Sequence, residues 1–196
     1  MADFDAEAVD RETLRLFHTG YAEIRKPDIH YGRKNADFGQ GFYLSDSAEF
    51  AGKWMRERKD AVIHVNSYEL DLSGLRLLRL TRDERWLDYI LRNRAGAADR
   101  FPDADVIIGP IANDTIYDTL GILTSGFLTR EQSLQLLHIG PCFAQIVLKT
   151  ERAAARLRWL SARVLAHEEA ARFRERVGRE EADYQQSLAE ALENMI

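Results

Sequence analysis

Apolar and polar residues follow two different spacings along this chain, and the changes of spacing mark separate elements. Alternation, or a short continuous apolar run, is typical of strands, whereas apolar positions three and four apart are typical of helices. The pattern predicts strands at 14–18, 42–44, 61–72, 75–80, 104–108 and 141–150. It predicts helices at 47–58, at 81–94 and from about 113 and 129 onward. Because strands and helices are mixed without strict alternation, we expect an α+β fold instead of a doubly wound sheet.

Several predicted helices begin at side chains that can accept backbone hydrogen bonds. Two segments have the Thr-x-x-Glu/Gln spacing of a capping box, in which the first and fourth side chains bond each other's backbone N–H groups. Serine, aspartate and asparagine serve as simpler N-caps elsewhere. The capping boxes are Thr81 to Glu84 and Thr129 to Gln132, and the simpler candidates are Ser45 to Ser47 and Asn113 or Asp114.

From Glu151 to the end the chain has no proline and one glycine, Gly178, and it is rich in Ala, Arg, Glu and Leu. This composition predicts one or two long helices with a mostly solvated charged face. An apolar stripe that includes Tyr184, Leu188 and Leu192 runs along the segment. The stripe can pack on the rest of the domain, or it can bind a partner chain.

The composition narrows the function classes. The 196 residues fit one domain with an appendage. The formal net charge is −5, and the chain has no basic run of the kind that a general nucleic-acid binder carries, although a local basic pocket is still possible. Cys142 is the only cysteine, so the chain has no internal disulfide and no Cys/His cluster for zinc, which suits a reducing cytoplasm. We expect no signal peptide and no membrane span, because the N-terminus is acidic and no run of about 18 apolar residues exists.

The stretch DFGQGFYLS, residues 37–45, combines a glycine turn with a strand start. Gly39 and Gly41 allow positive φ angles and close approach of another backbone or a ligand. The following Phe42 and Tyr43 favour a strand. The stretch lacks the third glycine of a dinucleotide fingerprint and follows a loop, so a Rossmann fold is a poor match. By itself the pattern fits a hairpin turn as well as a ligand pocket.

Three motifs in sequence order, LFHTG, DFGQGFYLS and AQIVLKTE, resemble the ADP-ribosyltransferase superfamily. The resemblance is to the branch with His, Tyr and Glu motifs, shared by diphtheria-toxin-like enzymes and poly(ADP-ribose) polymerases. More narrowly, DFGQGFYL and IGPIANDTIYD are similar to a bacterial family first catalogued as a domain of unknown function, several members of which lie beside antitoxin-like genes. The resemblance therefore implies an antitoxin as a possible partner of the C-terminal apolar stripe, with a second copy of the chain as the alternative. The resemblance implies two curved, mostly antiparallel sheets that form an NAD cleft at 13–160, between a flexible segment at 1–12 and a helical extension at 161–196.

The resemblance also implies roles for individual residues. His18 would bond a ribose hydroxyl of NAD, although a half-buried structural histidine is the alternative. Thr19 stands where the polymerases have a glycine whose backbone grips the nicotinamide amide, and Gly20 would restore flexibility. The Tyr43 ring would stack on nicotinamide. Arg33 could meet the pyrophosphate, because guanidinium groups bind phosphate through two hydrogen bonds. The remaining cofactor-binding candidates are Asp37, Gly41 and Asn113.

Gln145 lies where the superfamily usually has its catalytic glutamate. A glutamine can hydrogen-bond the ribose, but it carries no charge and cannot act as a base. Asp114 or Glu151 could supply the missing charge, and Asp114 is equally suited to cap a helix. The catalytic candidates are His18, Tyr43, Gln145 and Asp114. With glutamine at this position we expect single transfer instead of polymer growth.

The leading hypothesis from sequence is a cytoplasmic bacterial mono-ADP-ribosyltransferase, a toxin or defence effector, with NAD as substrate and no metal. Two alternatives remain open. Water could be the acceptor, which would make the protein an NAD glycohydrolase. The chain could also be an inactive transferase fold that serves as an NAD-binding or protein-interaction module. The acceptor could be protein, RNA, DNA or a small molecule.

Overall fold

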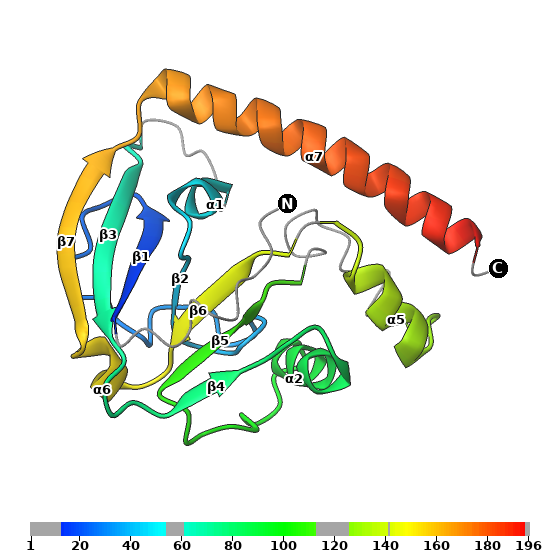
Figure 1. Ribbon diagram of the computed structural model, residues 1–196, viewed down its shortest axis with the longest axis horizontal. Helices are drawn as coiled ribbons and strands as arrows, with labels where there is room; N and C mark the ends of the chain where they lie inside the picture. The colour runs from blue at the N-terminus through cyan, green and yellow to red at the C-terminus, as the bar shows by residue number, and fades with distance from the viewer. Residues whose placement is uncertain (1–12, 54–60, 113–125, 141, 195–196) are drawn as a thin grey trace.

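The computed structural model describes residues 13–53, 61–112, 126–140 and 142–194. The described part contains two sheets and five helices, which confirms the α+β class (Figure 1). The first sheet has the order β1 (Thr13–Gly20), β3 (His64–Asp71) and β7 (Leu157–Val164), and both of its pairings are antiparallel. The second has the order β2 (Phe42–Leu44), β6 (Ala144–Leu148), β5 (Val106–Pro110) and β4 (Leu77–Arg79). Only β4 and β5 pair in parallel.

The five helices pack around these sheets. They are α1 (Ala48–Lys53), α2 (Glu84–Arg94), α5 (Arg130–Leu137), the single turn α6 (Glu151–Ala154) and α7 (His167–Glu193). One apolar cluster joins the two sheets and contains Leu16, Tyr68, Phe42, Ile146 and Leu148. A second cluster lies on the other face of the second sheet, where α2 covers it, and contains Trp86, Ile90, Phe38, Ile107 and Val147. Alternate residues of β6 therefore enter different clusters, as expected of a strand with both faces covered.

The helix predicted directly after Glu151 is wrong beyond its first turn. Thr150 caps α6 by accepting a hydrogen bond from the Ala153 N–H, and the chain then enters β7. The Ala- and Arg-rich composition favours a helix, but seven of the eight residues of β7 pair with the central strand β3, and Leu157 is buried. Long-range pairing and burial overrode the local preference.

The cap predictions had mixed outcomes. The capping box from Thr129 to Gln132 is confirmed, with both reciprocal hydrogen bonds present. Ser47 caps α1, since its hydroxyl accepts a 3.1 Å bond from the Phe50 N–H. The box predicted at Thr81 is wrong by two residues: Asp83 is the N-cap of α2 and accepts the Trp86 N–H, and the Thr81 hydroxyl bonds the Asp83 carboxylate. The helix predicted from about 113 lies outside the described residues.

Helix α7 is attached to the rest of the chain near both ends. Near its start, Ala170 and the preceding Leu165 are buried against Val65 of β3. Towards its end, Tyr184 and Leu188 are buried against Leu136 of α5, and Figure 1 shows the helix extending from β7 towards α5. The described apolar stripe is therefore used within the chain. In the described part of the chain no helix is long and apolar enough to cross a membrane.

Candidate functional site

In the described part of the chain, one isolated β-bridge joins the two sheets. It pairs Phe17, on β1, with Ser45, the residue directly after β2. The Phe17 N–H donates to the Ser45 carbonyl at 2.7 Å, and the Ser45 N–H donates to the Phe17 carbonyl at 2.9 Å. In a continuing antiparallel ladder, the next pair in this direction would be Thr19 with Tyr43. In the described part of the chain the bridge is not extended to that pair. We call the place formed by His18, Thr19 and Tyr43 the β1–β2 junction.

At this junction the His18 side chain takes the backbone acceptor that the next ladder bond would use, the Tyr43 carbonyl. Its Nδ1 lies 2.8 Å from the Tyr43 carbonyl oxygen. Because a carbonyl only accepts hydrogen bonds, Nδ1 carries the proton, and Nε2 of the neutral ring is left as an acceptor. Burial lowers the pKa of His18 below its ordinary value of 6.5, with the Tyr43 carbonyl opposing the shift, so the ring is neutral at pH 7. The imidazole also packs on the Phe42 ring, with 4.7 Å between centroids.

The backbone of Thr19 faces away from β3. Hydrogen-bonding direction alternates along an antiparallel strand, and Phe17 directs its N–H and C=O towards Ser45. Thr19, two residues later, therefore presents its own N–H and C=O at the same edge of β1. Its side chain lies on the same face of the sheet as that of Phe17, opposite to His18. At Gly20 an added Cβ would lie 3.6 Å from His18 Nε2, so this glycine leaves the approach to Nε2 open.

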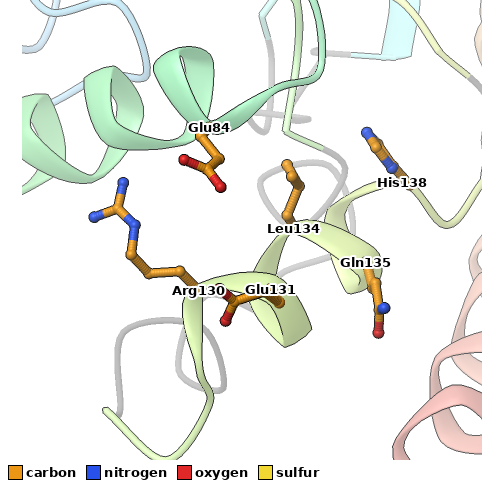
Figure 2. Close-up of a pocket in the computed structure, with 6 residues that line it drawn as sticks. All are labelled: Glu84, Arg130, Glu131, Leu134, Gln135 and His138. Carbon is orange, nitrogen blue, oxygen red and sulfur yellow. The ribbon is translucent and has the colours of Figure 1, made fainter.

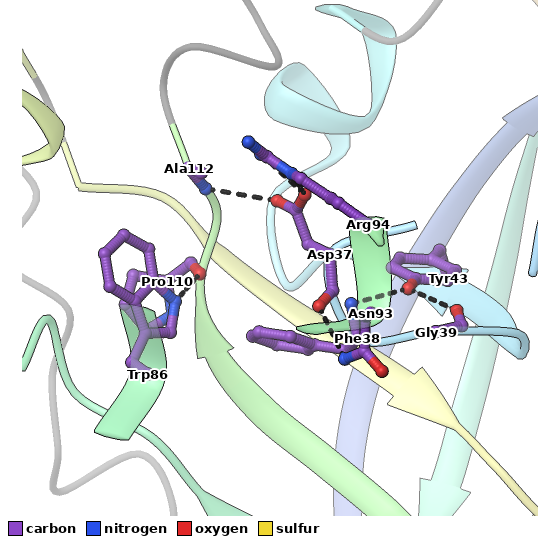
Figure 3. A network of polar contacts seen from close by, with 9 residues as sticks. All are labelled: Asp37, Phe38, Gly39, Tyr43, Trp86, Asn93, Arg94, Pro110 and Ala112. Atoms are coloured by element: carbon purple, nitrogen blue, oxygen red, sulfur yellow. Dashed lines mark hydrogen bonds and ion pairs between the residues drawn. The ribbon is translucent and has the colours of Figure 1, made fainter. Parts of the chain in front are cut away.

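Tyr43 ties the glycine turn at 37–41 to the junction (Figure 3). Its hydroxyl accepts the Phe38 N–H at 3.0 Å and donates to the Gly39 carbonyl at 2.7 Å. Gly39 has a φ of 72°, where a side chain would be strained. Burial raises the pKa of Tyr43 well above its ordinary value of 10.0, and the Asp37 charge adds to this rise. The ring is thus held at both ends, by β2 and by the turn.

Asp37, predicted to bind the cofactor, is occupied within the protein. Its side chain is 6% exposed, and Oδ1 accepts bonds of 2.9 and 2.7 Å from Nε and a terminal nitrogen of Arg94. Its Oδ2 lies 3.3 Å from the Ala112 N–H, and the Asn93 amide donates to its backbone carbonyl at 2.9 Å. Figure 3 shows these groups converging on one side of the turn. The arrangement makes Asp37 an anchor of the turn.

Sequence reasoning missed Lys149, which holds the turn from the other side. Its Nζ donates to the Phe38 carbonyl at 2.6 Å and lies 3.2 Å from the Asp99 carboxylate. That carboxylate also accepts a 2.9 Å bond from the Tyr89 hydroxyl. Burial lowers the pKa of Lys149, and Asp99 opposes the shift. The position directly after the strand in QIVLKTE was the available clue, since a lysine there must be solvated or paired.

Gly41 and Arg33 have different surroundings. Gly41 is buried, and a Cβ there would lie 2.6 Å from the Leu148 carbonyl oxygen, so the glycine permits β2 to approach β6. The predicted cofactor role of Gly41 therefore has a packing explanation. Arg33 is exposed, and its charge lowers the pKa of Tyr43, which places it within electrostatic reach of the junction.

Gln145 lies on β6 opposite Gly109 and is 3% exposed. Tyr43 pairs with Val147, and side chains two apart on a strand share a face, so Gln145 and Tyr43 lie on the same face of the sheet. The Gln145 Nε2 has no hydrogen-bond partner among the described residues. Such a buried donor is uncommon and is a candidate for bonding a ligand oxygen.

The other carboxylate candidates do not complete the site. Asn113 and Asp114 lie outside the described residues. Glu151 starts α6, with its side chain 75% exposed and 3.6 Å from the His30 ring. Within the described ranges, no three His, Cys, Asp or Glu side chains are grouped so that they could hold a metal.

A pocket of about 280 Å³ lies between α2 and α5. Figure 2 shows Glu84 from α2 facing Arg130 and Leu134 of α5, with His138 beyond the helix end. None of the residues predicted to bind NAD lines this pocket. The pocket therefore shares no lining residue with the β1–β2 junction, and side chains of both charges line it.

The fold and the junction define an α+β protein in which two largely antiparallel sheets are joined through one bridge beside a neutral histidine. The chain belongs to the family described as "Protein of unknown function (DUF3990)", whose model matches residues 14–159. Comparison with curated proteins gave no match, and neither did comparison with solved structures.

Proposed function

We propose that this protein is an NAD-dependent mono-ADP-ribosyltransferase that acts in the cytoplasm as a toxin or effector, with the two sheets as a transferase-type fold. The observation that carries the proposal is the bond between His18 and the Tyr43 carbonyl. It takes the place of a ladder bond and leaves the N–H and C=O of Thr19 at a strand edge. A primary amide such as that of nicotinamide offers the complementary acceptor and donor.

The side chains around this edge suit the rest of the substrate. His18 Nε2 is an acceptor and would receive a hydrogen bond from a ribose hydroxyl. The half-buried Tyr43 ring is fixed through its hydroxyl and would offer a flat apolar surface to nicotinamide. Arg33 is exposed nearby and would meet the pyrophosphate.

The reaction would be a transfer of the ADP-ribosyl group. The bond between ribose C1′ and the nicotinamide nitrogen breaks, and its electron pair neutralises the pyridinium. A nucleophile of the acceptor forms the new bond to C1′ and loses its proton. Gln145 would hold the ribose through its amide, without the negative charge that a glutamate would place near the sugar cation. Single transfer follows from this weaker assistance.

The same glutamine favours a second candidate, an inactive NAD-binding module. The transferase, the inactive module and the NAD glycohydrolase can be distinguished by measuring nicotinamide release from NAD by the purified chain, with and without cell lysate. Release that requires lysate supports a transferase, release in buffer alone supports a glycohydrolase, and NAD binding without release supports the inactive module.

Three variants test whether the junction is the site. His18→Asn retains a donor near the position of Nδ1 but lacks Nε2, and we expect at least a tenfold loss of release, of the size of a lost charged or buried hydrogen bond. Gly20→Ala adds a methyl group 3.6 Å from Nε2 and 3.4 Å from Ile24 Cδ1, ordinary contacts that preserve folding and obstruct the acceptor. Thr19→Ala keeps the backbone and should retain activity.

His138→Ala is the matched control, because His138 is exposed and lines the separate pocket between α2 and α5. Release that survives both His18→Asn and Gly20→Ala at the level of His138→Ala would show that the β1–β2 junction is not the site of the reaction.

A further inference from the structure

The segment between β1 and β2 is a long loop that is pinned to the protein at several backbone groups. The Asn66 side chain binds the Ala22 carbonyl at 3.0 Å and the Ile24 N–H at 2.9 Å, and the Tyr68 hydroxyl donates to the Ile24 carbonyl at 2.7 Å. Further along, the Gln40 amide donates to the carbonyls of His30 and Gly32 at 2.6 and 3.1 Å. Ile29 is buried in the core. The loop therefore has a fixed path.

One aromatic side chain on this fixed loop is almost fully solvated. Tyr31 is 92% exposed, whereas Ile29 beside it is 4% exposed. The backbone of Tyr31 is held, since its N–H lies 3.3 Å from the Asp28 carbonyl, and its neighbours on both sides are bound by Gln40. Solvating an aromatic ring forgoes the stabilisation that burial would give, and here no other exposed apolar residue accompanies it between 25 and 34.

The same ten residues carry an excess of positive charge on an acidic protein. Residues 25–34 contain four cations and one carboxylate, while the whole chain has a net charge of −5. The carboxylate, Asp28, accepts the His30 N–H at 2.8 Å within the loop. The cations are Arg25, Lys26, Arg33 and Lys34, and all four are exposed. Arg25 pairs with Glu23 at 2.9 Å, so the proposal rests on Arg33 and Lys34. Arg33 and Lys34 lie within three residues of Tyr31.

The loop lies next to the β1–β2 junction. At Gly32 an added Cβ would be 2.6 Å from the Gly41 carbonyl oxygen, so the residue after Tyr31 touches the chain two residues before Tyr43. The charge of Arg33 acts on the Tyr43 hydroxyl. A molecule bound at Tyr31 is thus close to the place where the proposed transfer would occur.

We propose that Tyr31, together with Arg33 and Lys34, binds single-stranded nucleic acid, and that this nucleic acid is the acceptor of the transferase. The binding surface stands on its own observations, and only the acceptor role rests on the proposed function. Exposed aromatic rings stack on unpaired bases, and adjacent cations contact the phosphates. An acidic protein would also meet the cations, but a stable protein interface needs a larger apolar centre than one ring.

The test is fluorescence anisotropy of labelled DNA and RNA oligonucleotides of about 12 nucleotides, a length within the usual range for such sites, titrated at several salt concentrations without NAD. We expect Tyr31→Ala to weaken binding about 5- to 150-fold, the loss of one stacked base, and to leave the salt dependence unchanged. Tyr31→Phe should bind like the wild type. Lys34→Ala should reduce the slope of log affinity against log salt by about 0.7, as for one lost phosphate contact.

Arg179→Ala is the control for charge, since Arg179 is exposed on α7 and pairs with Glu175 at 3.7 Å. Absence of oligonucleotide binding at low salt would overturn the proposal, and so would binding that Tyr31→Ala leaves unchanged. Displacement by polyglutamate with no effect of Tyr31→Ala would instead assign the loop to acidic proteins. A raised KM for NAD in Tyr31→Ala with unaltered oligonucleotide affinity would assign the ring to NAD.

The DNA and RNA arms distinguish the two kinds of strand. Oligonucleotide binding without nicotinamide release under any condition would leave this surface standing and would refute the transferase. Release with labelling of protein alone would refute the acceptor role.

Discussion

The ion pair between Asp37 and Arg94 is expected to dominate the stability of the glycine turn. Both side chains are nearly buried, 6% and 11% exposed, and the guanidinium approaches Oδ1 with two nitrogens at 2.7 and 2.9 Å. Removing one partner from a buried pair of this kind costs about 3–5 kcal/mol. Asp37→Ala and Arg94→Met should therefore each lower the free energy of unfolding by about that amount, a large fraction of the roughly 5–15 kcal/mol of a typical domain.

The assay is urea unfolding followed by tryptophan fluorescence, for which the fully buried Trp86 is a suitable probe. With a urea dependence of about 2 kcal/mol per molar, each variant should lower the midpoint by about 2 M. The double variant Asp37→Ala/Arg94→Met should cost much less than the sum of the single variants, because the interaction is lost only once.

The chain supplies a matched surface pair. Arg158 lies 2.5 Å from Glu69, with side chains 64% and 41% exposed, and exposed pairs contribute at most about 1 kcal/mol. If Asp37→Ala is no more costly than Glu69→Ala, or if the double-mutant cycle shows no coupling, the turn is held by other contacts and the reasoning from burial is refuted.

Three other predictions concern the same region. Gly41→Ala places a methyl group 2.6 Å from the Leu148 carbonyl oxygen and should lower the free energy of unfolding by about 1 kcal/mol or more, whereas Gly178→Ala, with nothing within 4 Å, should raise it. Because the folded pKa of His18 is below 6.5, the unfolded chain binds more protons, so stability should fall as pH drops through 6.5, and His18→Gln should flatten that part of the profile. Lys149→Met removes a donor to the turn and should reduce both stability, by about 1–3 kcal/mol, and nicotinamide release, with recovery in Lys149→Arg.

The elements that were predicted from sequence are those whose pattern is local. The alternation at 14–18 identified β1, and the apolar run at 104–108 identified β5, although the strand lies at 106–110. Pro110 ends this strand, paired with Ala144, because a proline lacks only the N–H donor and is tolerated at a strand end. The Thr129 box was predictable for the same reason, since both partners lie within one helical turn.

Strand β7 and the anchors of the turn could not be predicted in this way. The partner of β7 is β3, about ninety residues earlier, and the register includes an irregularity between Ser67 and Tyr68. Asp37 and Arg94 are 57 positions apart, and Lys149 is 111 positions from Phe38. A polar residue near a glycine turn has the same sequence signal whether it binds a ligand or a distant arginine, so the sequence predicted a cofactor role for Asp37 and could not predict its ion pair with Arg94.

The contact between His18 and Tyr43 links the shape of the fold to its proposed chemistry. Continued pairing of β1 with β2 would satisfy the backbone of Thr19 and remove it from any ligand. In this structure the His18 Nδ1–H takes the Tyr43 carbonyl as its acceptor instead, and the same bond fixes the tautomer in which Nε2 can accept. The same place in the fold therefore combines an end of β1–β2 pairing, the backbone of Thr19 at a strand edge and a ring nitrogen that can accept a hydrogen bond, which are the features that the proposed NAD site requires. A structural histidine would make the first bond alone, whereas the proposed site also uses the second nitrogen, so Gly20→Ala, whose added methyl group would lie 3.6 Å from Nε2, distinguishes the two roles.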